Sequence, residues 1–289
     1  MLSTVRLSAY AKINLTLDIL GKRPDGYHEI STVMQSVGLS DRITLSHGEG
    51  LRLFCREDTL PAGKENTAFA AASLFFTAAG ISPSVTIELE KRIPQAAGLA
   101  GGSADAAAVL LGLNRMYGAP LDQSALLNLS RQIGADVPFC LLGGTMLATG
   151  TGERLASLSP MPDCGILIIK PCGKPSTGEM YRRIDGHARL PHPSAEAAAA
   201  ALKKEDLRAL AAALGNAFSA VWPSEEIAAA LAALNAAGAL GASLSGSGPS
   251  VFGVFESLAA AQAAAIPFQT RYPESFAVCP VQQGVEILT

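Results

Sequence analysis

The sequence predicts a two-domain protein of the α+β class. At 289 residues the chain exceeds the usual size of one domain, and 49% of its residues are hydrophobic, which is enough for two cores. Strand-like and helix-like segments alternate without a regular period or an internal repeat, as in α+β proteins. The composition changes at residues 158–163, which contain two prolines. We therefore expect an N-terminal domain over residues 1–160 and a C-terminal domain over residues 161–289.

Composition and charge argue against several classes of protein. The formal net charge is -3 and no basic stripe occurs, so neither nucleic acid nor a membrane is expected as a partner. Residues 227–255 lack charge, but glycines and Asn235 break them into pieces too short to cross a bilayer. Residues 1–8 are too polar for a signal peptide. The five cysteines lack metal-binding spacing, so we expect free thiols in a cytoplasmic protein. They are Cys55, Cys140, Cys164, Cys172 and Cys279.

The first element is a strand over residues 5–20. Its second part alternates polar and apolar residues, which predicts a half-buried strand with one polar face. The polar positions are Lys12, Asn14, Thr16 and Asp18. Taken alone, such a face is most simply solvated. Residues 21–26, with the sequence GKRPDG, predict a hairpin turn, and Tyr27 and His28 follow at its exit.

Capping and breaking residues bound the later elements. An alanine-rich helix is capped by Asn66, runs to Ala79 and is followed by Gly80. Gly134 ends a helix that begins near Asp122, and Ser224 caps another. Further strands are expected at 42–46, 51–55, 85–89, 165–169 and 251–255, further helices at 106–113, 195–202, 207–214 and 225–237, and a hairpin at 143–153.

Between the strand at 85–89 and the helix at 106–113, residues 94–104 are mostly small. Small side chains before a helix leave backbone N–H groups free to surround an anion, which the helix dipole also favours. The stretch has neither the lysine of a Walker A loop nor the G-x-G-x-x-G spacing of a Rossmann turn. By itself it is equally typical of a tight turn. The order of strand, small-residue loop and helix favours a phosphate site, and we call residues 94–104 the phosphate loop.

Two other features have ordinary interpretations when taken alone. Asp136 lies between the helix end at Gly134 and Pro138, where an aspartate commonly caps the next helix. Residues 244–250, with the sequence LSGSGPS, precede a strand and are typical of a flexible turn.

Together, three stretches resemble the motifs of the GHMP kinases, the family of galactokinase, homoserine kinase and mevalonate kinase. They are Ala11–Leu15, residues 94–106 and Leu244–Gly248. The resemblance covers essentially the whole chain. It implies an N-terminal domain like ribosomal protein S5 domain 2, a ferredoxin-like C-terminal domain, an active site in the cleft between them, and ATP with Mg²⁺.

Two further motifs resemble one branch of the family. They are PDGYH at residues 24–28 and GADVPF at residues 134–139. This branch transfers the γ-phosphoryl group of ATP to the tertiary 2-hydroxyl of CDP-methylerythritol, in the non-mevalonate route to isoprenoid precursors. The resemblance thus implies a small-molecule kinase and its acceptor substrate.

The resemblance also assigns roles to residues. Asp136 would be the catalytic carboxylate, and Lys12 its cationic partner. Asn66 and Lys91 would line the adenine side. The ATP phosphates would be held by Pro94, Gln95, Ala96, Ala97, Gly98, Leu99, Ala100, Gly101, Gly102, Ser103 and Ala104. The rings of Tyr27 and Tyr181 would sandwich the cytosine, and other substrate contacts would come from Asn14, His28, Thr177, Gly246 and Ser247.

The chain departs from the family at Asp105, where asparagine is frequent. A carboxylate there would repel phosphates unless it faces Mg²⁺ or the helix, and the sequence assigns no metal ligands and no oligomeric state. Two alternatives stay open: another GHMP small-molecule kinase such as homoserine kinase, and a non-catalytic metabolite sensor. Tyr27, His28 and Tyr181 argue against the first, and the presence of both Lys12 and Asp136 argues against the second.

Overall fold

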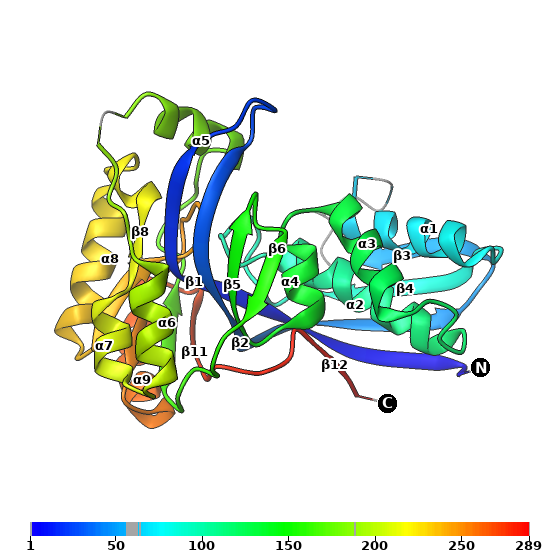
Figure 1. Ribbon diagram of the computed structural model, residues 1–289. Coiled ribbons are helices and arrows are strands. Elements are labelled where there is room, and N and C mark those ends of the chain that lie inside the picture. Colours follow the sequence, from blue (N-terminus) through cyan, green and yellow to red (C-terminus); the bar gives the residue numbers. More distant parts are fainter. Residues whose placement is uncertain (1, 56–62, 64, 188, 289) are drawn as a thin grey trace.

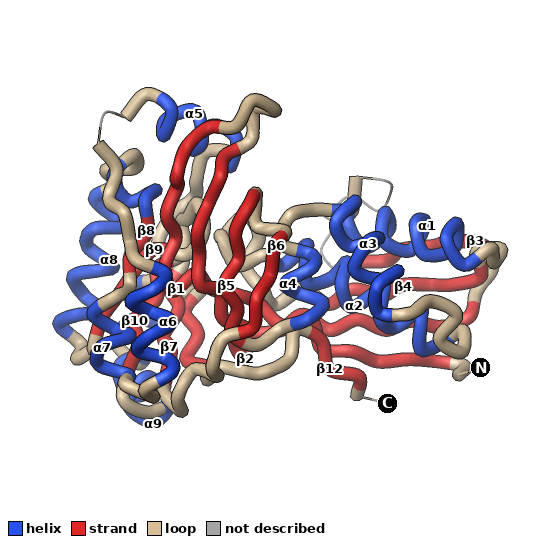
Figure 2. The backbone as a smooth tube through the Cα atoms, viewed as in Figure 1, coloured by secondary structure: helices blue, strands red, loops and turns tan. Residues whose placement is uncertain are grey.

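Two β-sheets organise the protein (Figures 1 and 2), and the computed structural model describes residues 2–55, 63, 65–187 and 189–288. The larger sheet contains β1 (Thr4–Lys22), β2 (His28–His47), β3 (Gly50–Cys55), β4 (Ser84–Glu90), β5 (Thr145–Gly150), β6 (Arg154–Ser157), β8 (Gly215–Asn216) and β12 (Val285–Ile287). The smaller sheet has the order β11 (Ser275–Val278), β7 (Gly165–Ile169), β10 (Val251–Phe255), β9 (Gly241–Leu244). These two sheets, together with the helices described below, confirm the predicted α+β class.

The helices form two groups (Figure 1). The first lies beside the larger sheet and consists of α1 (Thr67–Ala79), α2 (Gly101–Met116), α3 (Gln123–Ile133) and α4 (Val137–Leu142). The second consists of α5 (Thr177–Asp185), α6 (Ala195–Lys203), α7 (Leu207–Ala212), α8 (Glu225–Ala236), α9 (Leu258–Ala265) and α10 (Phe268–Arg271), with a 3₁₀ helix at Ala217–Ala220. No helix in the described part of the chain has both the length and the apolar character that crossing a bilayer requires.

The β1–β2 hairpin extends through the molecule from the N-terminus to a tip beside α5 (Figure 1). It pairs from Thr4 opposite Ser46 to Lys22 opposite His28, so the predicted strand and turn are confirmed. The expected separate strand at 42–46 is instead the end of β2. Gly38 and Leu39 bulge out where the register shifts opposite Tyr10 and Ala11. Gly38, at this bulge, interrupts the strand-like pattern of the sequence, so only the later part of β2 was predicted.

The polar face of β1 is buried, so the predicted half-buried strand is wrong. Lys12, Asn14, Thr16 and Asp18 are 4%, 2%, 0% and 7% exposed. The side chains obtain partners from neighbouring segments: Thr16 Oγ1 accepts a bond from the backbone N–H of Val33, and Asp18 lies 2.9 Å from His192. The C-terminal half contributes to this burial, since β8 pairs with β1 at Thr16 and His192 lies against Asp18. The polar face is buried by segments from elsewhere in the chain. The alternation of polar and apolar residues within one strand cannot predict such tertiary contacts.

Helix boundaries agree best with the prediction where a side chain caps the helix. The side chains of Asn66, Asp122 and Ser224 accept backbone N–H bonds at the starts of α1, α3 and α8. Gly80 ends α1 with a φ of 66°. Helix α2 differs, because it begins at Gly101 and so includes the last residues of the phosphate loop. No prediction was made for α5, α9, β9, β11 or β12.

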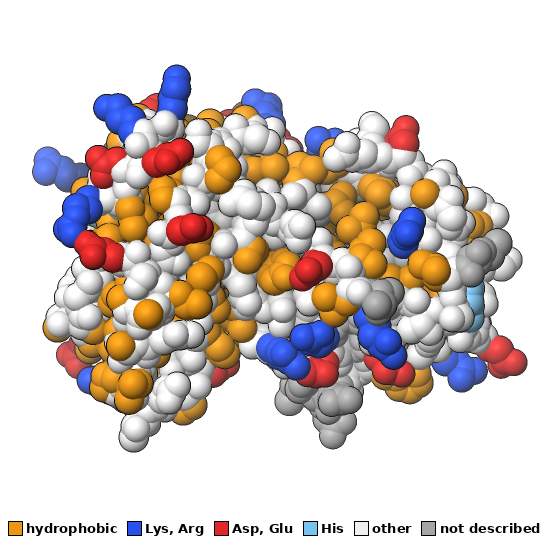
Figure 3. Space-filling model, turned by 90° about the horizontal axis from the view of Figure 1, so that it is seen from below, with side chains coloured by type: hydrophobic (Ala, Val, Ile, Leu, Met, Phe, Trp, Pro, Cys, Tyr) orange, Lys and Arg blue, Asp and Glu red, His pale blue; other side chains and the backbone are white. Residues whose placement is uncertain are grey.

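Strands from both halves of the chain share the larger sheet. The C-terminal strands β8 and β12 both pair with β1, while α8 and α9 pack on the smaller sheet. The division at residues 160 and 161 stays a prediction. On the face in Figure 3, the described Lys and Arg side chains are interspersed with Asp and Glu and form no basic concentration.

Candidate active site

A cavity of about 950 Å³ brings the predicted site residues together. It is lined from β1, the phosphate loop, Asp136, α5 and the loop that precedes β10. Every predicted site residue borders it except Leu99 and Ala104, which are 1% and 0% exposed and belong to the apolar core. The three stretches that resemble family motifs therefore meet at one cavity.

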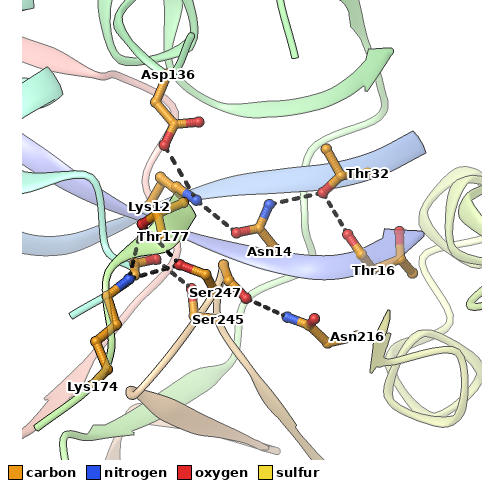
Figure 4. A network of polar contacts seen from close by, with 12 residues as sticks. Lys12, Asn14, Thr16, Thr32, Asp136, Lys174, Thr177, Asn216, Ser245 and Ser247 are labelled. Carbon is orange, nitrogen blue, oxygen red and sulfur yellow. Dashed lines mark hydrogen bonds and ion pairs between the residues drawn. The ribbon is translucent and has the colours of Figure 1, made fainter. Parts of the chain in front are cut away.

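Lys12 and Asp136 face each other in this cavity (Figure 4). Lys12 Nζ lies 3.6 Å from Asp136 Oδ2, and it donates a 2.7 Å hydrogen bond to Asn14 Oδ1. Asn14 Nδ2 in turn donates to Thr32 Oγ1. The Lys12 side chain is 5% exposed and that of Asp136 is 38% exposed. The chain of bonds orients a buried ammonium toward a carboxylate that solvent or a ligand can reach.

The alternative interpretation of Asp136 as a helix cap fails for its side chain. Asp136 occupies the position before α4, but its carboxylate makes no capping bond there. The carboxylate points toward Lys12 instead (Figure 4).

The phosphate loop is held by its own carbonyl groups. Lys12 N–H donates to Leu99 O, Ser250 N–H donates to Ala97 O, and Ser245 Oγ donates to Gly98 O at 3.0 Å. The backbone is left-handed at Ala96, Gly98 and Ala100, with φ values of 49°, 77° and 58°. The loop ends at the first turn of the 16-residue helix α2. The backbone N–H groups of a first turn have no partners within their own helix. Such a terminus with small side chains suits a bound anion.

Aromatic and charged side chains form another part of the cavity wall. Tyr27, on the β1–β2 turn, is 67% exposed. Tyr181 stacks on His28, with ring centroids 4.7 Å apart, and meets the ring of Phe218 edge-on. Asp185 Oδ1 lies 2.7 Å from His28 Nε2, and Lys22 binds the other oxygen of the same carboxylate. Among the described residues, Tyr27 and Tyr181 make no ring contact with each other, and the cytosine sandwich stays a prediction.

Comparison with known proteins identifies the family. Residues 66–144 match the description "GHMP kinases N terminal domain", and residues 198–273 match "GHMP kinases C terminal". The chain belongs to the GHMP kinase family. A GHMP kinase from Pelotomaculum thermopropionicum is 46% identical over 90% of this chain and 92% of its own length. One from Moorella thermoacetica is 43% identical over 95% of this chain and 98% of its own. Both are named 4-diphosphocytidyl-2-C-methyl-D-erythritol kinase.

Solved GHMP kinase structures share the architecture. The crystal structure of a 4-(cytidine 5'-diphospho)-2C-methyl-D-erythritol kinase superposes with a TM-score of 0.82 at 36% identity, over 95% of this chain and 98% of that one. Homoserine kinase from Cytophaga hutchinsonii gives a TM-score of 0.77 at 22% identity, over 100% of this chain and 98% of that one, a likeness of fold alone. The family and fold that the three motifs predicted are confirmed.

Lys91 borders the cavity of this GHMP kinase, but its ammonium is bound to protein carboxylates. Its Nζ contacts both Asp41 and Asp105, which are 0% and 3% exposed. Asp41 also accepts backbone bonds from Arg92 and Ile93, 2.6 and 2.8 Å long, just before the phosphate loop. Burial raises the pKa of Asp105, while the charge of Lys91 opposes the rise. The carboxylate that departs from the family pattern therefore faces a lysine.

Replacing Lys91 tests this buried cluster. Lys91→Met leaves two buried carboxylates without a cation, so we expect the free energy of unfolding to fall by about 3–5 kcal/mol. With the ammonium gone, burial keeps the folded-state pKa of Asp105 above the unfolded value and no lysine charge opposes the rise, so the folded state binds more protons and stability falls as pH rises. Denaturant unfolding at about pH 5 and about pH 8 measures both effects, and the deficit is expected to be smaller at the lower pH.

Two variants control this prediction. Arg92→Met removes a half-exposed cation next in sequence and is expected to change stability by less than about 1 kcal/mol. Lys91→Met combined with Asp105→Asn is expected to recover part of the loss, because one uncompensated charge is removed. Equal stability of Lys91→Met and the wild type would contradict the assigned pairing.

Several residues at the site escaped the sequence analysis. Asp41, Lys174, Asp185 and Phe218 were not singled out, although the last three border the cavity. Each is an isolated residue in a segment without a distinctive motif, and its partner lies far away in the sequence. The sequence alone could not single out these four residues, because their role depends on contacts that only the folded structure shows.

The described residues contain no group of three or more His, Cys, Asp or Glu side chains that could hold a metal ion. Of the carboxylates that line the cavity, Asp105 is bound to Lys91 and Asp185 to His28 and Lys22. Asp136 is partly exposed, and Glu65, the fourth carboxylate of the lining, is exposed. This donor set fits Mg²⁺ bound mainly through nucleotide phosphates and water, which needs only one or two protein carboxylates.

Proposed function

We propose that this GHMP kinase transfers the γ-phosphoryl group of ATP to the 2-hydroxyl of 4-diphosphocytidyl-2-C-methyl-D-erythritol, yielding the 2-phosphate and ADP for isoprenoid precursor synthesis. The observation that carries the proposal is the Lys12 and Asp136 pair, 3.6 Å apart in a cavity that also contains the phosphate loop and an aromatic wall. The names of the relatives that are 43–46% identical over most of the chain support the same acceptor.

In this reaction Asp136 orients the acceptor hydroxyl and takes its proton as the oxygen attacks the γ-phosphorus. Lys12, held by Asn14, stabilises the negative charge that develops on the attacking oxygen. Backbone N–H groups of the phosphate loop and of the first turn of α2 hold the ATP phosphates in line, since phosphoryl transfer depends chiefly on positioning and charge neutralisation. When bound, Mg²⁺ would neutralise phosphate charge, and Asp136 or Glu65, which both line the cavity, would hold it.

The decisive experiment for this function is an ADP-release assay with a panel of acceptors. We expect turnover with the CDP-linked alcohol and little with homoserine, mevalonate or free methylerythritol phosphate. Turnover of homoserine would instead indicate another GHMP kinase activity. ATP binding without ADP release on any acceptor would indicate a sensor.

The aromatic wall gives a prediction about the base. We propose that cytosine stacks on Tyr27 beside the Tyr181 and His28 pair. Stacking on a base contributes about 1–3 kcal/mol, so Tyr27→Ala should raise KM for the CDP-linked acceptor by roughly 5- to 100-fold. Because Tyr27 is 67% exposed, this change should leave the fold intact.

Initial rates against acceptor concentration measure the effect, and Tyr27→Phe is the matched control, since it keeps the ring and loses only the hydroxyl. We expect Tyr27→Phe to resemble the wild type. A KM for Tyr27→Ala equal to that of the wild type would remove Tyr27 from the base site.

A further inference from the structure

Lys174 lies in the segment between β7 and α5 and borders the cavity. Its Nζ donates a 2.7 Å hydrogen bond to Ser247 Oγ and a 3.2 Å bond to Thr177 Oγ1 (Figure 4). The two hydroxyls lie 3.2 Å from each other. Two segments far apart in the sequence, residues 174–177 and the loop that contains Ser247, thus place one ammonium and two hydroxyl groups together at the cavity wall.

None of the residues that the structure describes provides a counterion for the charge of Lys174. Among the described residues, the other three lysines that line the cavity each pair with a carboxylate: Lys12 with Asp136, Lys22 with Asp185, and Lys91 with Asp41 and Asp105. By contrast, no carboxylate of the described residues forms an ion pair with Lys174. Burial, together with the positive charge of Lys12, lowers the pKa of Lys174 to about 8. A partly desolvated ammonium without a countercharge is unfavourable until an anion binds.

The position of Lys174 indicates which anion it binds. Thr177 and Tyr181 are four residues apart on α5 and therefore lie on the same face of the helix. Tyr181 belongs to the aromatic wall, whereas Lys12, whose charge acts on Lys174, belongs to the catalytic pair. In a nucleoside-diphosphate-linked alcohol, the diphosphate connects the base to the alcohol that reacts. The Lys174 cluster adjoins both ends of such a ligand, because Thr177 shares a helix face with Tyr181 and the charge of Lys12 acts on Lys174.

We propose that Lys174, together with Thr177 and Ser247, binds the diphosphate of the nucleoside-diphosphate-linked acceptor and so selects it over the free alcohol phosphate. This inference rests on the proposed function. The competing ligand is the γ-phosphoryl group of ATP, and the test separates the two.

The kinetic test uses Lys174→Met, which removes the charge and leaves the two hydroxyls able to bond to each other. We expect KM for the CDP-linked acceptor to rise by about 10- to 100-fold, the loss of one charge-assisted hydrogen bond. KM for ATP and kcat should change less than about threefold, a difference worth under ~0.7 kcal/mol. Lys174→Arg keeps the charge and should fall between the wild type and Lys174→Met. Lys203→Gln, an exposed lysine at the end of α6, is the control and should match the wild type.

Calorimetric titration of the full chain with CDP and with cytidine gives a second readout. Lys174→Met should weaken CDP binding by about the same factor as the change in KM and leave cytidine binding unaltered, because only CDP carries phosphates. A rise in KM for ATP with the acceptor KM unchanged would assign Lys174 to ATP and overturn the inference. Equal CDP affinity in Lys174→Met and Lys203→Gln would also overturn it.

Failure of the proposed function and failure of the inference about Lys174 give different experimental results. If the wild type does not phosphorylate the CDP-linked acceptor, the proposed function is wrong, and the comparison of CDP with cytidine still decides the role of Lys174. If the wild type is active and Lys174→Met is equally active with an unchanged acceptor KM, only the inference about Lys174 is wrong.

Discussion

Asp136→Asn is expected to lower kcat by about 10²- to 10⁴-fold, the usual contribution of a general base. Asparagine has nearly the same shape but cannot take the proton from the acceptor hydroxyl, and it removes the negative charge that lies 3.6 Å from Lys12 Nζ. ATP affinity should change little, because the phosphate loop, which would bind the nucleotide, is a separate segment. Single-turnover and steady-state ADP release measure the rate, and equilibrium titration with ATP measures the affinity.

Asp163→Asn is the matched control for this prediction. Asp163 is an exposed carboxylate in the segment before β7, outside the cavity lining, and its replacement should leave kcat unchanged. If Asp136→Asn turned over the CDP-linked acceptor at the wild-type rate, the assignment of Asp136 would be wrong. A loss of ATP affinity as large as the loss of kcat would make Asp136 a nucleotide-binding residue instead.

Gly98→Ala is expected to damage both stability and ATP binding. A Cβ at position 98 would lie 2.2 Å from Ser245 O and 3.0 Å from Gly248 O, and the φ of +77° is unfavourable for alanine. The contacts involve backbone atoms, so the phosphate loop and residues 244–250 would have to separate. We expect the free energy of unfolding to fall by about 3 kcal/mol or more, from overpacking and left-handed strain together. The melting temperature should fall by roughly 5–10 °C, and KM for ATP should rise at least about tenfold.

Gly50→Ala separates the steric part from the conformational part. Gly50 has a φ of +68°, close to that of Gly98, but a Cβ there would meet no atom within 4 Å. This control carries the backbone strain alone and should lose only about 1–2 kcal/mol with an unchanged KM for ATP. Thermal unfolding and ATP titration of the two variants give the comparison. Equal losses in both would mean that the approach of the two loops is not what requires glycine at position 98.

Local features of the chain predicted local structure well. Helices α1, α3 and α8 begin where Asn66, Asp122 and Ser224 predict, because a capping side chain bonds to a backbone group only two or three residues away. The strand β2 was predicted only in part, because its bulge at Gly38 depends on pairing with β1. Helix α5 was not predicted, although Ser176 caps it.

The residues of the site were largely predicted from the sequence, but their ion-pair partners were not. The motif stretches and the candidate residues within them were named from the sequence, and all but Leu99 and Ala104 border one cavity. The counterions were not predicted. Asp41 lies 50 positions from Lys91 and Asp185 lies 157 positions from His28, and neither separation follows any helical or strand period.

The sequence by itself determined the α+β class, the resemblance to the GHMP kinases, and the residues expected to carry the chemistry, because small-residue loops, caps and motif spacings are properties of neighbouring residues. Only the tertiary structure decided that the polar face of β1 is buried, that Lys91 is bound between two carboxylates, and that Lys174 borders the cavity with no carboxylate partner in the described part of the chain. The physical reason is that electrostatic interactions and desolvation depend on distances in space. Those distances are set when β1 is covered by segments that lie more than a hundred residues further along the chain.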